Sequence, residues 1–94
     1  MEKLTQEQLE TGLGELPDWT LNGESIQRTF SFDDFKSAMA FVTRIAARAE
    51  AVQHHPDILV RYNKVTLTLS THDAGGLSER DMSFAADCDE LLCC

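Results

Sequence analysis

Apolar and polar residues follow two different periods along this 94-residue chain. Apolar residues that recur every three or four positions are typical of an amphipathic helix, and strict alternation is typical of a half-buried strand. With helix-start and turn signals, these periods predict helices over residues 5–13, 33–53 and 78–91, and strands over residues 19–22, 25–31, 58–62 and 65–71. The order is α-β-β-α-β-β-α in a single domain of residues 1–94. We therefore expect an α+β fold, with a four-stranded antiparallel sheet and helices packed on one face.

Each predicted helix begins with the same local pattern. A Ser or Thr is followed three residues later by an acid or amide, with apolar residues on either side, which is a capping box with a hydrophobic staple. The three pairs are Thr5 with Gln8, Ser31 with Asp34, and Ser78 with Asp81. Pro17 stops the first helix. His55 precedes Pro56, which disfavours the helical conformation of the residue before it, so the second helix must end before His55.

The second helix is the longest and carries a clear apolar stripe. Its expected buried residues recur at spacings of three and four, and they are Phe35, Met39, Val42, Ala46 and Ala49. Phe41, Ile45 and Val52 widen this stripe. We therefore expect the helix to face both the sheet and another subunit.

Two hairpin turns are predicted, the first at Asn22-Gly23, because both residues tolerate positive φ. The second lies at Asn63-Lys64 or at Tyr62-Asn63. The former places His55 opposite His72, and the latter shifts the partners by two residues. The same strand faces meet in both cases. The expected core face carries Ile58, Val60 and Tyr62 with Val65, Leu67 and Leu69.

Composition restricts the classes of partner. The chain has 8 basic and 16 acidic residues and a formal charge of -8, which disfavours direct binding of nucleic acid. No apolar run approaches the roughly 20 residues of a membrane span, and the N-terminus lacks a signal-peptide core. The 3 cysteines are odd in number and lie near the C-terminus, so they form no disulfide framework. We expect a cytoplasmic protein.

All 3 histidines lie in one third of the chain, at His54, His55 and His72. Acids flank them at Glu50, Asp57, Asp73 and Asp81. Imidazole can both give and take a proton near neutral pH, so this segment predicts a site for proton transfer. If the second helix reaches His54, Glu50 lies four residues before it on the same face and can orient its imidazole.

Several of these residues also have plain structural explanations. His-His-Pro at a helix C-terminus can stabilise the helix dipole without chemistry. Asp81 can be a capping residue alone, and Glu79 and Arg80 are typical of a solvated first turn. Zinc can use three histidines, but an adjacent pair is not a typical spacing and no Cys lies nearby. Ser70 and Ser78 lack the nucleophile elbow that a hydrolase serine needs.

The histidine segment resembles the pterin-4a-carbinolamine dehydratases. The pattern consists of an acid, three residues, His-His-Pro, an aromatic residue, a third His and a later Asp, and here it reads Glu50, His54-His55-Pro56, Tyr62, His72 and Asp81. The stretches YNKVTLTLSTHD and GLSERD are also similar to the family. The resemblance extends from about Trp19 onward and is weakest in the first helix and the acidic tail.

The resemblance implies loss of water from 4a-hydroxytetrahydropterin to give quinonoid dihydropterin, without a cofactor or metal, in a homodimer or homotetramer. It makes His54 and His72 the acid and base, with His55 chiefly binding substrate and Glu50 and Asp81 orienting imidazoles. The implied catalytic residues are His54, His55, His72 and Glu50. The implied pterin-binding residues are Gln53, His54, His55, Ser70, Thr71, His72, Asp73 and Asp81.

Two other functions remain open from the sequence. Some animal relatives also serve as a dimerisation cofactor of a homeodomain transcription factor, which would use a helical surface and leave the histidines dispensable. A role in molybdopterin metabolism would use the same pocket with another pterin.

Overall fold

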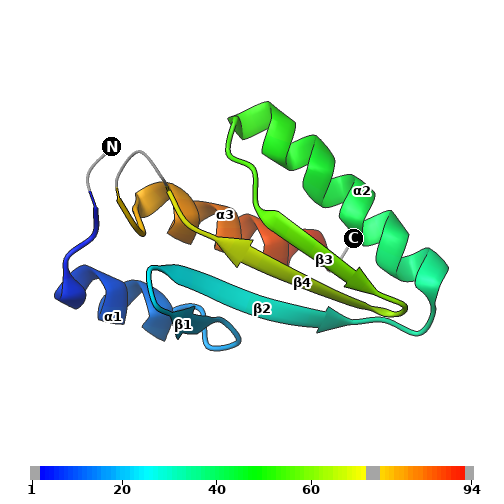
Figure 1. Ribbon diagram of the computed structural model, residues 1–94, viewed down its shortest axis with the longest axis horizontal. Coiled ribbons are helices and arrows are strands. Elements are labelled where there is room, and N and C mark those ends of the chain that lie inside the picture. Colours follow the sequence, from blue (N-terminus) through cyan, green and yellow to red (C-terminus); the bar gives the residue numbers. More distant parts are fainter. Residues whose placement is uncertain (1–2, 72–74, 93–94) are drawn as a thin grey trace.

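The computed structural model describes residues 3–71 and 75–92. The helices and strands follow one another in the predicted order (Figure 1). They are α1 (Gln6–Gly14), β1 (Thr20–Asn22), β2 (Ser25–Ser31), α2 (Phe35–Val52), β3 (Asp57–Arg61), β4 (Lys64–Leu69) and α3 (Glu79–Leu92). No helix in the described ranges is long and apolar enough to span a membrane.

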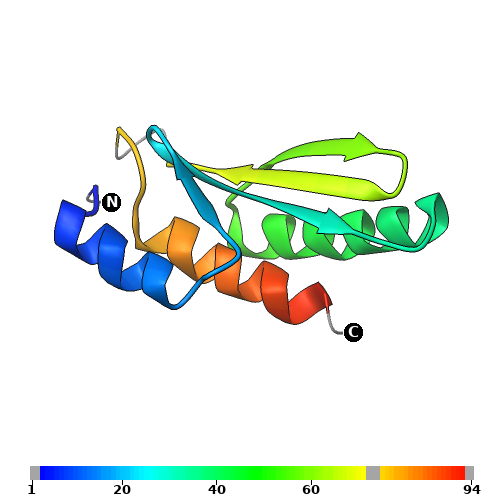
Figure 2. The same ribbon diagram turned by 90° about the horizontal axis from the view of Figure 1, so that it is seen from below.

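The four strands form one antiparallel sheet in the order β1-β2-β4-β3. Figure 2 shows all three helices on the same face of this sheet. The predicted α+β class, the antiparallel sheet and the one-sided helical layer are therefore confirmed. Because β4 lies between β2 and β3, its C-terminal end is held on both sides, and from there the chain continues toward α3.

Both hairpin turns lie one residue away from their first expected places. Asn22 pairs with Ser25, so the first turn consists of Gly23 and Glu24, and the prediction of Asn22-Gly23 is wrong. Gly23 has a φ of 64°, which glycine adopts without steric cost. Arg61 pairs with Lys64, so the second turn is the Tyr62-Asn63 alternative.

The register of the hairpin between β3 and β4 decides which of the predicted residues face the core. Asp57 pairs with Thr68, so the register that would place His55 opposite His72 is not formed. Val60 does oppose Val65, and Ile58 opposes Leu67. However, Tyr62 lies in the turn with 69% of its surface exposed, so its assignment to the core is wrong. Ile58 is 38% exposed because β3 is an edge strand.

The helix starts follow the predicted chemistry in α1 but not in α2. In α1, the Thr5 hydroxyl accepts from the Gln8 backbone N–H and the Gln8 side chain accepts from the Thr5 N–H, which confirms the capping box. The cap of α2 is Asp34 and not Ser31, because Ser31 is still part of β2. The Asp34 carboxylate accepts the Ser37 N–H at 2.8 Å, and this hydrogen bond lowers the pKa of Asp34.

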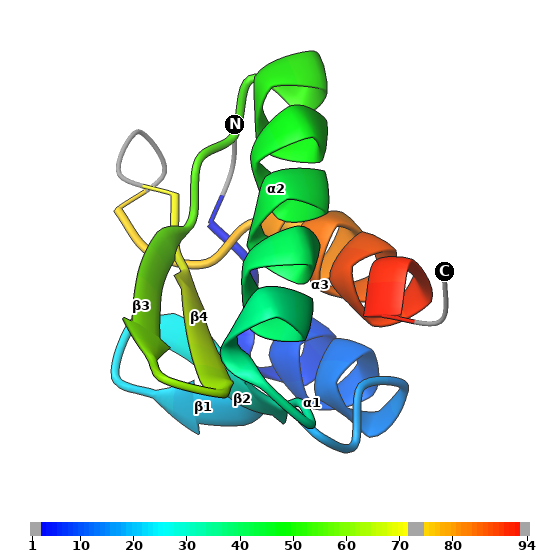
Figure 3. The ribbon, with the colours of Figure 1, turned by 90° about the vertical axis from the view of Figure 1, so that its right-hand side faces the viewer.

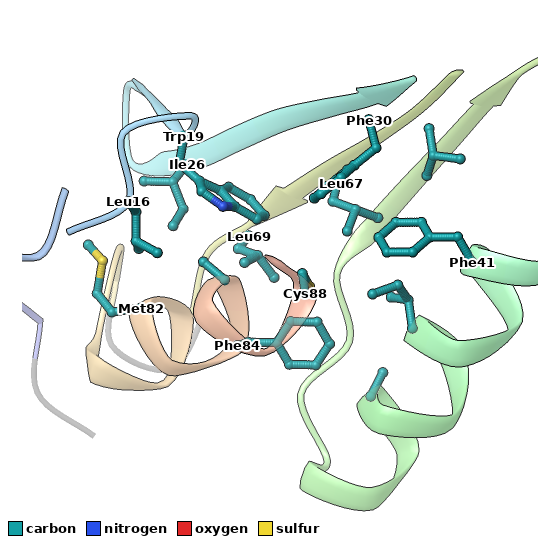
Figure 4. Packing of buried hydrophobic residues seen from close by; sticks show 14 of the residues in the cluster. Leu16, Trp19, Ile26, Phe30, Phe41, Leu67, Leu69, Met82, Phe84 and Cys88 are labelled. Carbon is teal, nitrogen blue, oxygen red and sulfur yellow. The ribbon is translucent and has the colours of Figure 1, made fainter. Parts of the chain in front are cut away.

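The buried stripe of α2 differs from the predicted one. The sheet covers a row of residues at spacings of three and four, namely Ala38, Phe41, Ile45 and Ala49. Phe35 and Met39, which were expected in the core, are 49% and 37% exposed. Of the predicted stripe, Ala49 is buried and Val42 is half-buried, whereas Ala46 is exposed. Phe41, which was expected to widen the stripe, is fully buried and packs against Phe30 with ring centroids 4.7 Å apart (Figure 4).

The position of the stripe predicts unequal effects of two truncations in α2. Ile45→Ala removes a fully buried side chain and should lower the free energy of unfolding by about 2–5 kcal/mol. Met39→Ala removes a side chain on the outer face of the same helix and should cost less than about 1 kcal/mol. Urea denaturation monitored by circular dichroism would measure both values. An equal loss for Met39→Ala would contradict the exposure of this face.

Candidate active site

The end of α2 turns the chain toward α3 at His54. Gln53 follows the last helical residue in the left-handed conformation, with φ 55° and ψ 43°. The backbone N–H groups of Gln53 and His54 both donate to the Ala49 carbonyl, at 3.2 Å for His54. The helix therefore ends before His55, as Pro56 predicts, and His54 leaves the helical path. Figure 3 shows how α2 and α3 cross.

The imidazole of His54 is buried against α3. It is 8% exposed, and its Nε2 lies 2.7 Å from Oδ1 of Asp81, whose exposure is 0%. Its ring also meets the Phe84 ring edge-on, with centroids 6.0 Å apart and planes at 71°. A buried carboxylate that pairs with an imidazole fixes both its orientation and the nitrogen that carries the proton.

Three donors surround the Asp81 carboxylate. Oδ2 accepts the Ser78 backbone N–H at 2.9 Å and the Thr71 hydroxyl at 2.7 Å. Because Thr71 uses its proton for Asp81, it accepts the Ser78 hydroxyl across the 2.8 Å contact between the two. An ionised carboxylate only accepts, so Nε2 of His54 is the third donor.

The remaining nitrogen of His54 is the one available for chemistry. Within residues 3–71 and 75–92, no group forms a hydrogen bond with Nδ1 of His54. Every fully buried side-chain N or O atom in these ranges has a hydrogen-bond partner, so the unpaired Nδ1 is not fully buried. Nδ1 can therefore take a proton from a ligand when the ring is neutral and return it when the ring is charged.

Asp81 both caps α3 and holds the imidazole of His54, so the two explanations that the sequence allowed for it are compatible. It lies three residues after Ser78 and accepts the N–H of the residue that caps α3, as the capping box predicts. It also orients His54. The hydroxyl half of the box is absent, since Ser78 directs its hydroxyl to Thr71.

The second histidine of the pair lies in a different environment. Nε2 of His55 is 2.5 Å from Oε2 of Glu50, and the two side chains are 57% and 75% exposed. The expectation that Glu50 orients His54 is therefore wrong, because the left-handed residue between them turns His54 away. An ion pair this exposed adds little to stability.

The other predicted site residues divide into three groups. Thr71 and Asp81 join His54 in the buried network, whereas Ser70, which directly follows β4, is half-buried and is no part of that network. The Gln53 side chain donates to the Glu50 backbone carbonyl at 2.7 Å, so it stabilises the C-terminal end of α2. His72 and Asp73 lie outside the described residues, although Thr71 and Gly76 on either side of them form an antiparallel backbone pair.

Arg80 has a role that the sequence reasoning missed. It was expected in a solvated first turn, but its Nη2 donates to the carbonyls of Val52 and Gln53 at 2.9 and 2.6 Å. The sequence contained a signal for this role. A cation in the first turn of a helix interacts unfavourably with the helix dipole, so Arg80 at this position suggests a partner outside its own helix. Here the guanidinium binds carbonyls at the C-terminal end of α2, where a cation interacts favourably with the helix dipole.

A hollow of about 310 Å³ opens beside His54. Val52, Phe84 and the first turns of α3 form its walls, and apolar surface predominates in them. Its size is at the lower end of the range for small-molecule sites, about 300–1,000 Å³. A larger hollow of about 770 Å³ lies between α1 and α3, but neither of the histidines in the described part of the chain lines it.

Two other kinds of chemistry find no support in the described ranges. No group of three His, Cys, Asp or Glu residues there is arranged to hold a metal ion. Burial raises the pKa of the Cys88 thiol far above its usual range, with the nearby carboxylates of Asp89 and Asp87 adding to the effect. Cys88 is therefore a poor nucleophile at neutral pH.

Comparison with known proteins gives the family. The model of the family described as "Pterin 4 alpha carbinolamine dehydratase" matches residues 2–91. The chain belongs to this family. This membership confirms the resemblance that the histidine segment suggested.

Relatives of similar length support the assignment. The chain is 49% identical over 92 residues to a protein of Chloroflexus aurantiacus named "Putative pterin-4-alpha-carbinolamine dehydratase", with 98% of this chain and 99% of the relative covered. A protein of the same name from Acidobacterium capsulatum is 51% identical over 92 residues, with 98% and 100% covered.

Solved structures share the fold. A transcriptional coactivator/pterin dehydratase from Brucella melitensis has a TM-score of 0.92 at 34% identity, covering 97% of this chain and 99% of that one. A pterin dehydratase-like protein, described as a RuBisCO assembly factor in the alpha-carboxysome, has a TM-score of 0.66 at 25% identity, covering 79% and 86%. The fold therefore occurs in proteins described as enzymes and in proteins described as having other roles.

The Asp81 network predicts a change of tautomer in Asp81→Asn. The amide oxygen can still accept from Thr71 and Ser78, and the amide nitrogen then donates to Nε2 of His54. The proton of neutral His54 should therefore move to Nδ1. Long-range ¹H–¹⁵N spectra of the ring would show this exchange of roles between the two nitrogens.

Asp57→Asn is the matched control for Asp81→Asn, since Asp57 is exposed at the start of β3. Loss of the charge-assisted bonds should lower the free energy of unfolding of Asp81→Asn by about 1–3 kcal/mol, against less than about 0.5 kcal/mol for Asp57→Asn. An unchanged tautomer in Asp81→Asn would contradict the assigned proton positions.

Proposed function

We propose that this protein removes water from 4a-hydroxytetrahydropterin to give quinonoid dihydropterin, and that His54 exchanges a proton with the substrate. Membership of the pterin-4a-carbinolamine dehydratase family supports the substrate class. The observation that carries the role of His54 is the hydrogen bond from its Nε2 to buried Asp81, which leaves Nδ1 for the substrate.

The reaction needs two proton transfers. The bond between C4a and the hydroxyl breaks with its electron pair going to oxygen, and a protonated group supplies the proton that makes water. The N5–H proton leaves to a base, and the N5 lone pair forms the new double bond to C4a. An imidazole held in a fixed tautomer suits either transfer, because its orientation costs nothing further in the transition state.

The remaining roles follow the family resemblance. His72 would be the second acid–base group, and His55, supported by Glu50, would bind and orient substrate. Gln53, Ser70, Thr71 and Asp73 would form the pterin-contacting segments, with Thr71 also supporting Asp81. No cofactor or metal takes part in this reaction.

The cellular role belongs to the same proposal. The enzyme would act in the cytoplasm on the carbinolamine that aromatic amino-acid hydroxylases produce, and with a dihydropteridine reductase it would regenerate the tetrahydropterin. A homodimer or homotetramer is proposed as the working form. The exposed Phe35 and Met39 on α2 support such an assembly, because apolar surface of this kind is typical of contacts between subunits.

A binding module is the second candidate function. Relatives are described as a transcriptional coactivator/pterin dehydratase and as a RuBisCO assembly factor. The exposed apolar side of α2 is the observation that favours a partner-binding role, and such a role would survive loss of the histidines. A role with a molybdopterin-type substrate would instead use the same histidine site.

The decisive experiment measures dehydration of freshly generated 4a-hydroxytetrahydropterin by the wild type and by His54→Ala and His72→Ala. Each variant should lower kcat by about 10²–10⁴, the usual contribution of a positioned acid or base. The spontaneous rate and a circular-dichroism check of folding are the controls. His55→Ala should raise KM more than it lowers kcat, because His55 is proposed to bind.

Either of two outcomes would contradict the proposal. A near-normal rate in folded His54→Ala would exclude its role as proton donor or acceptor. No acceleration above the spontaneous rate by folded wild type would exclude the activity and leave the binding module as the function to test.

A further inference from the structure

Arg80 forms a hydrogen bond with the peptide unit that joins Gln53 to His54. The carbonyl of the Gln53–His54 peptide accepts from Nη2 of Arg80 at 2.6 Å. The N–H of the same peptide donates to the Ala49 carbonyl at 3.2 Å. Both polar ends of this unit are therefore fixed, and its plane sets the direction in which the His54 side chain leaves the backbone.

The same residue holds a strained conformation in place. Gln53 has the left-handed backbone conformation, with φ 55°, which is unfavourable for residues other than glycine. The two hydrogens of one Arg80 amino group reach the carbonyls of Val52 and Gln53, on either side of the Gln53 α-carbon. Removal of both bonds would let Gln53 relax, and His54 would move with it.

The neighbouring residue on α3 holds the other end of His54. Asp81 accepts from its ring at 2.7 Å, while Arg80 holds its backbone, so two consecutive residues of one helical turn fix both the main chain and the imidazole. Neither contact alone determines where Nδ1 lies, because a ring held at a single point can pivot about it.

We propose that Arg80 is a positioning residue for His54, and that it acts through the Gln53–His54 peptide. The hydrogen bonds that support this role are to backbone carbonyls, so we assign Arg80 no proton transfer of its own. This inference rests on the proposed function for its kinetic effect but not for its structural effect. Displacement of a reacting group by about 1 Å can lower a rate 100-fold, so the kinetic consequence is measurable.

Arg80→Met tests the proposal, since it keeps a long apolar stem and removes the donors. We expect kcat to fall on the order of 10-fold to 100-fold while KM changes less than about threefold. Arg48→Met is the matched control, because Arg48 also links α2 with α3, through Asp87 at 2.9 Å, but does not contact the Gln53–His54 peptide. It should keep the wild-type rate.

A double-mutant cycle separates positioning from general damage to the fold. In a His54→Ala background, Arg80→Met should cause almost no further loss of rate, because the residue through which it acts is already gone. Arg80→Lys should recover part of the rate. An equal loss from Arg80→Met in both backgrounds would overturn the proposal, as would a wild-type rate for Arg80→Met.

A spectroscopic measurement tests the inference without any activity. In the wild type, the ring ¹⁵N signals of His54 should show the proton fixed on Nε2, and in Arg80→Met they should shift toward the average of the two tautomers. Arg48→Met should leave them unchanged. An inactive wild type with this response would refute the dehydratase but keep the positioning role, whereas unchanged His54 signals in Arg80→Met would overturn the positioning role itself.

Discussion

The buried carboxylate of Asp81 is the constraint on which the rest of this structure depends. A carboxylate with no exposure must receive hydrogen bonds on both oxygens, because an unpaired buried charge is strongly unfavourable. The three donors are the Ser78 N–H just before α3, the Thr71 hydroxyl beyond the end of β4, and the ring of His54, two residues after α2. One side chain therefore joins the ends of α2 and β4 to the start of α3, and the position of His54 follows from this requirement.

Much of the fold could be predicted because it depends on local chemistry. The alternating strands, the Thr5 capping box and the stop before Pro56 use interactions between neighbours in sequence. The errors occur where a tertiary contact decides between two local options. Ser31 could cap α2, but β2 uses it as a strand residue, so Asp34 takes the role. The sheet likewise selects Phe41 and Ile45 over the neighbouring row that begins with Phe35.

The structure brings His54, Thr71 and Asp81 of the predicted site together. Their pairings were harder to predict, because helical spacing assigned Glu50 to His54, whereas it pairs with His55. The left-handed conformation of Gln53 changes the partner, and no simple rule predicts that conformation for glutamine. Its unfavourable place in the first turn of α3 was a signal for Arg80, but its partners are backbone carbonyls, which no side-chain pattern identifies. The register of the hairpin decided a further point, since it removed the pairing of His55 with His72.

The double use of Asp81 affects how related sequences can be read. A relative that no longer dehydrates pterins still needs an acceptor for the first N–H groups of its last helix, so folding alone would retain an acid there. The donor to the other carboxylate oxygen, in contrast, need not be an imidazole, because any hydrogen-bond donor at that place would satisfy it. The acid is therefore a marker of the architecture, and the histidine, together with the guanidinium that fixes its peptide, is the better marker of chemistry.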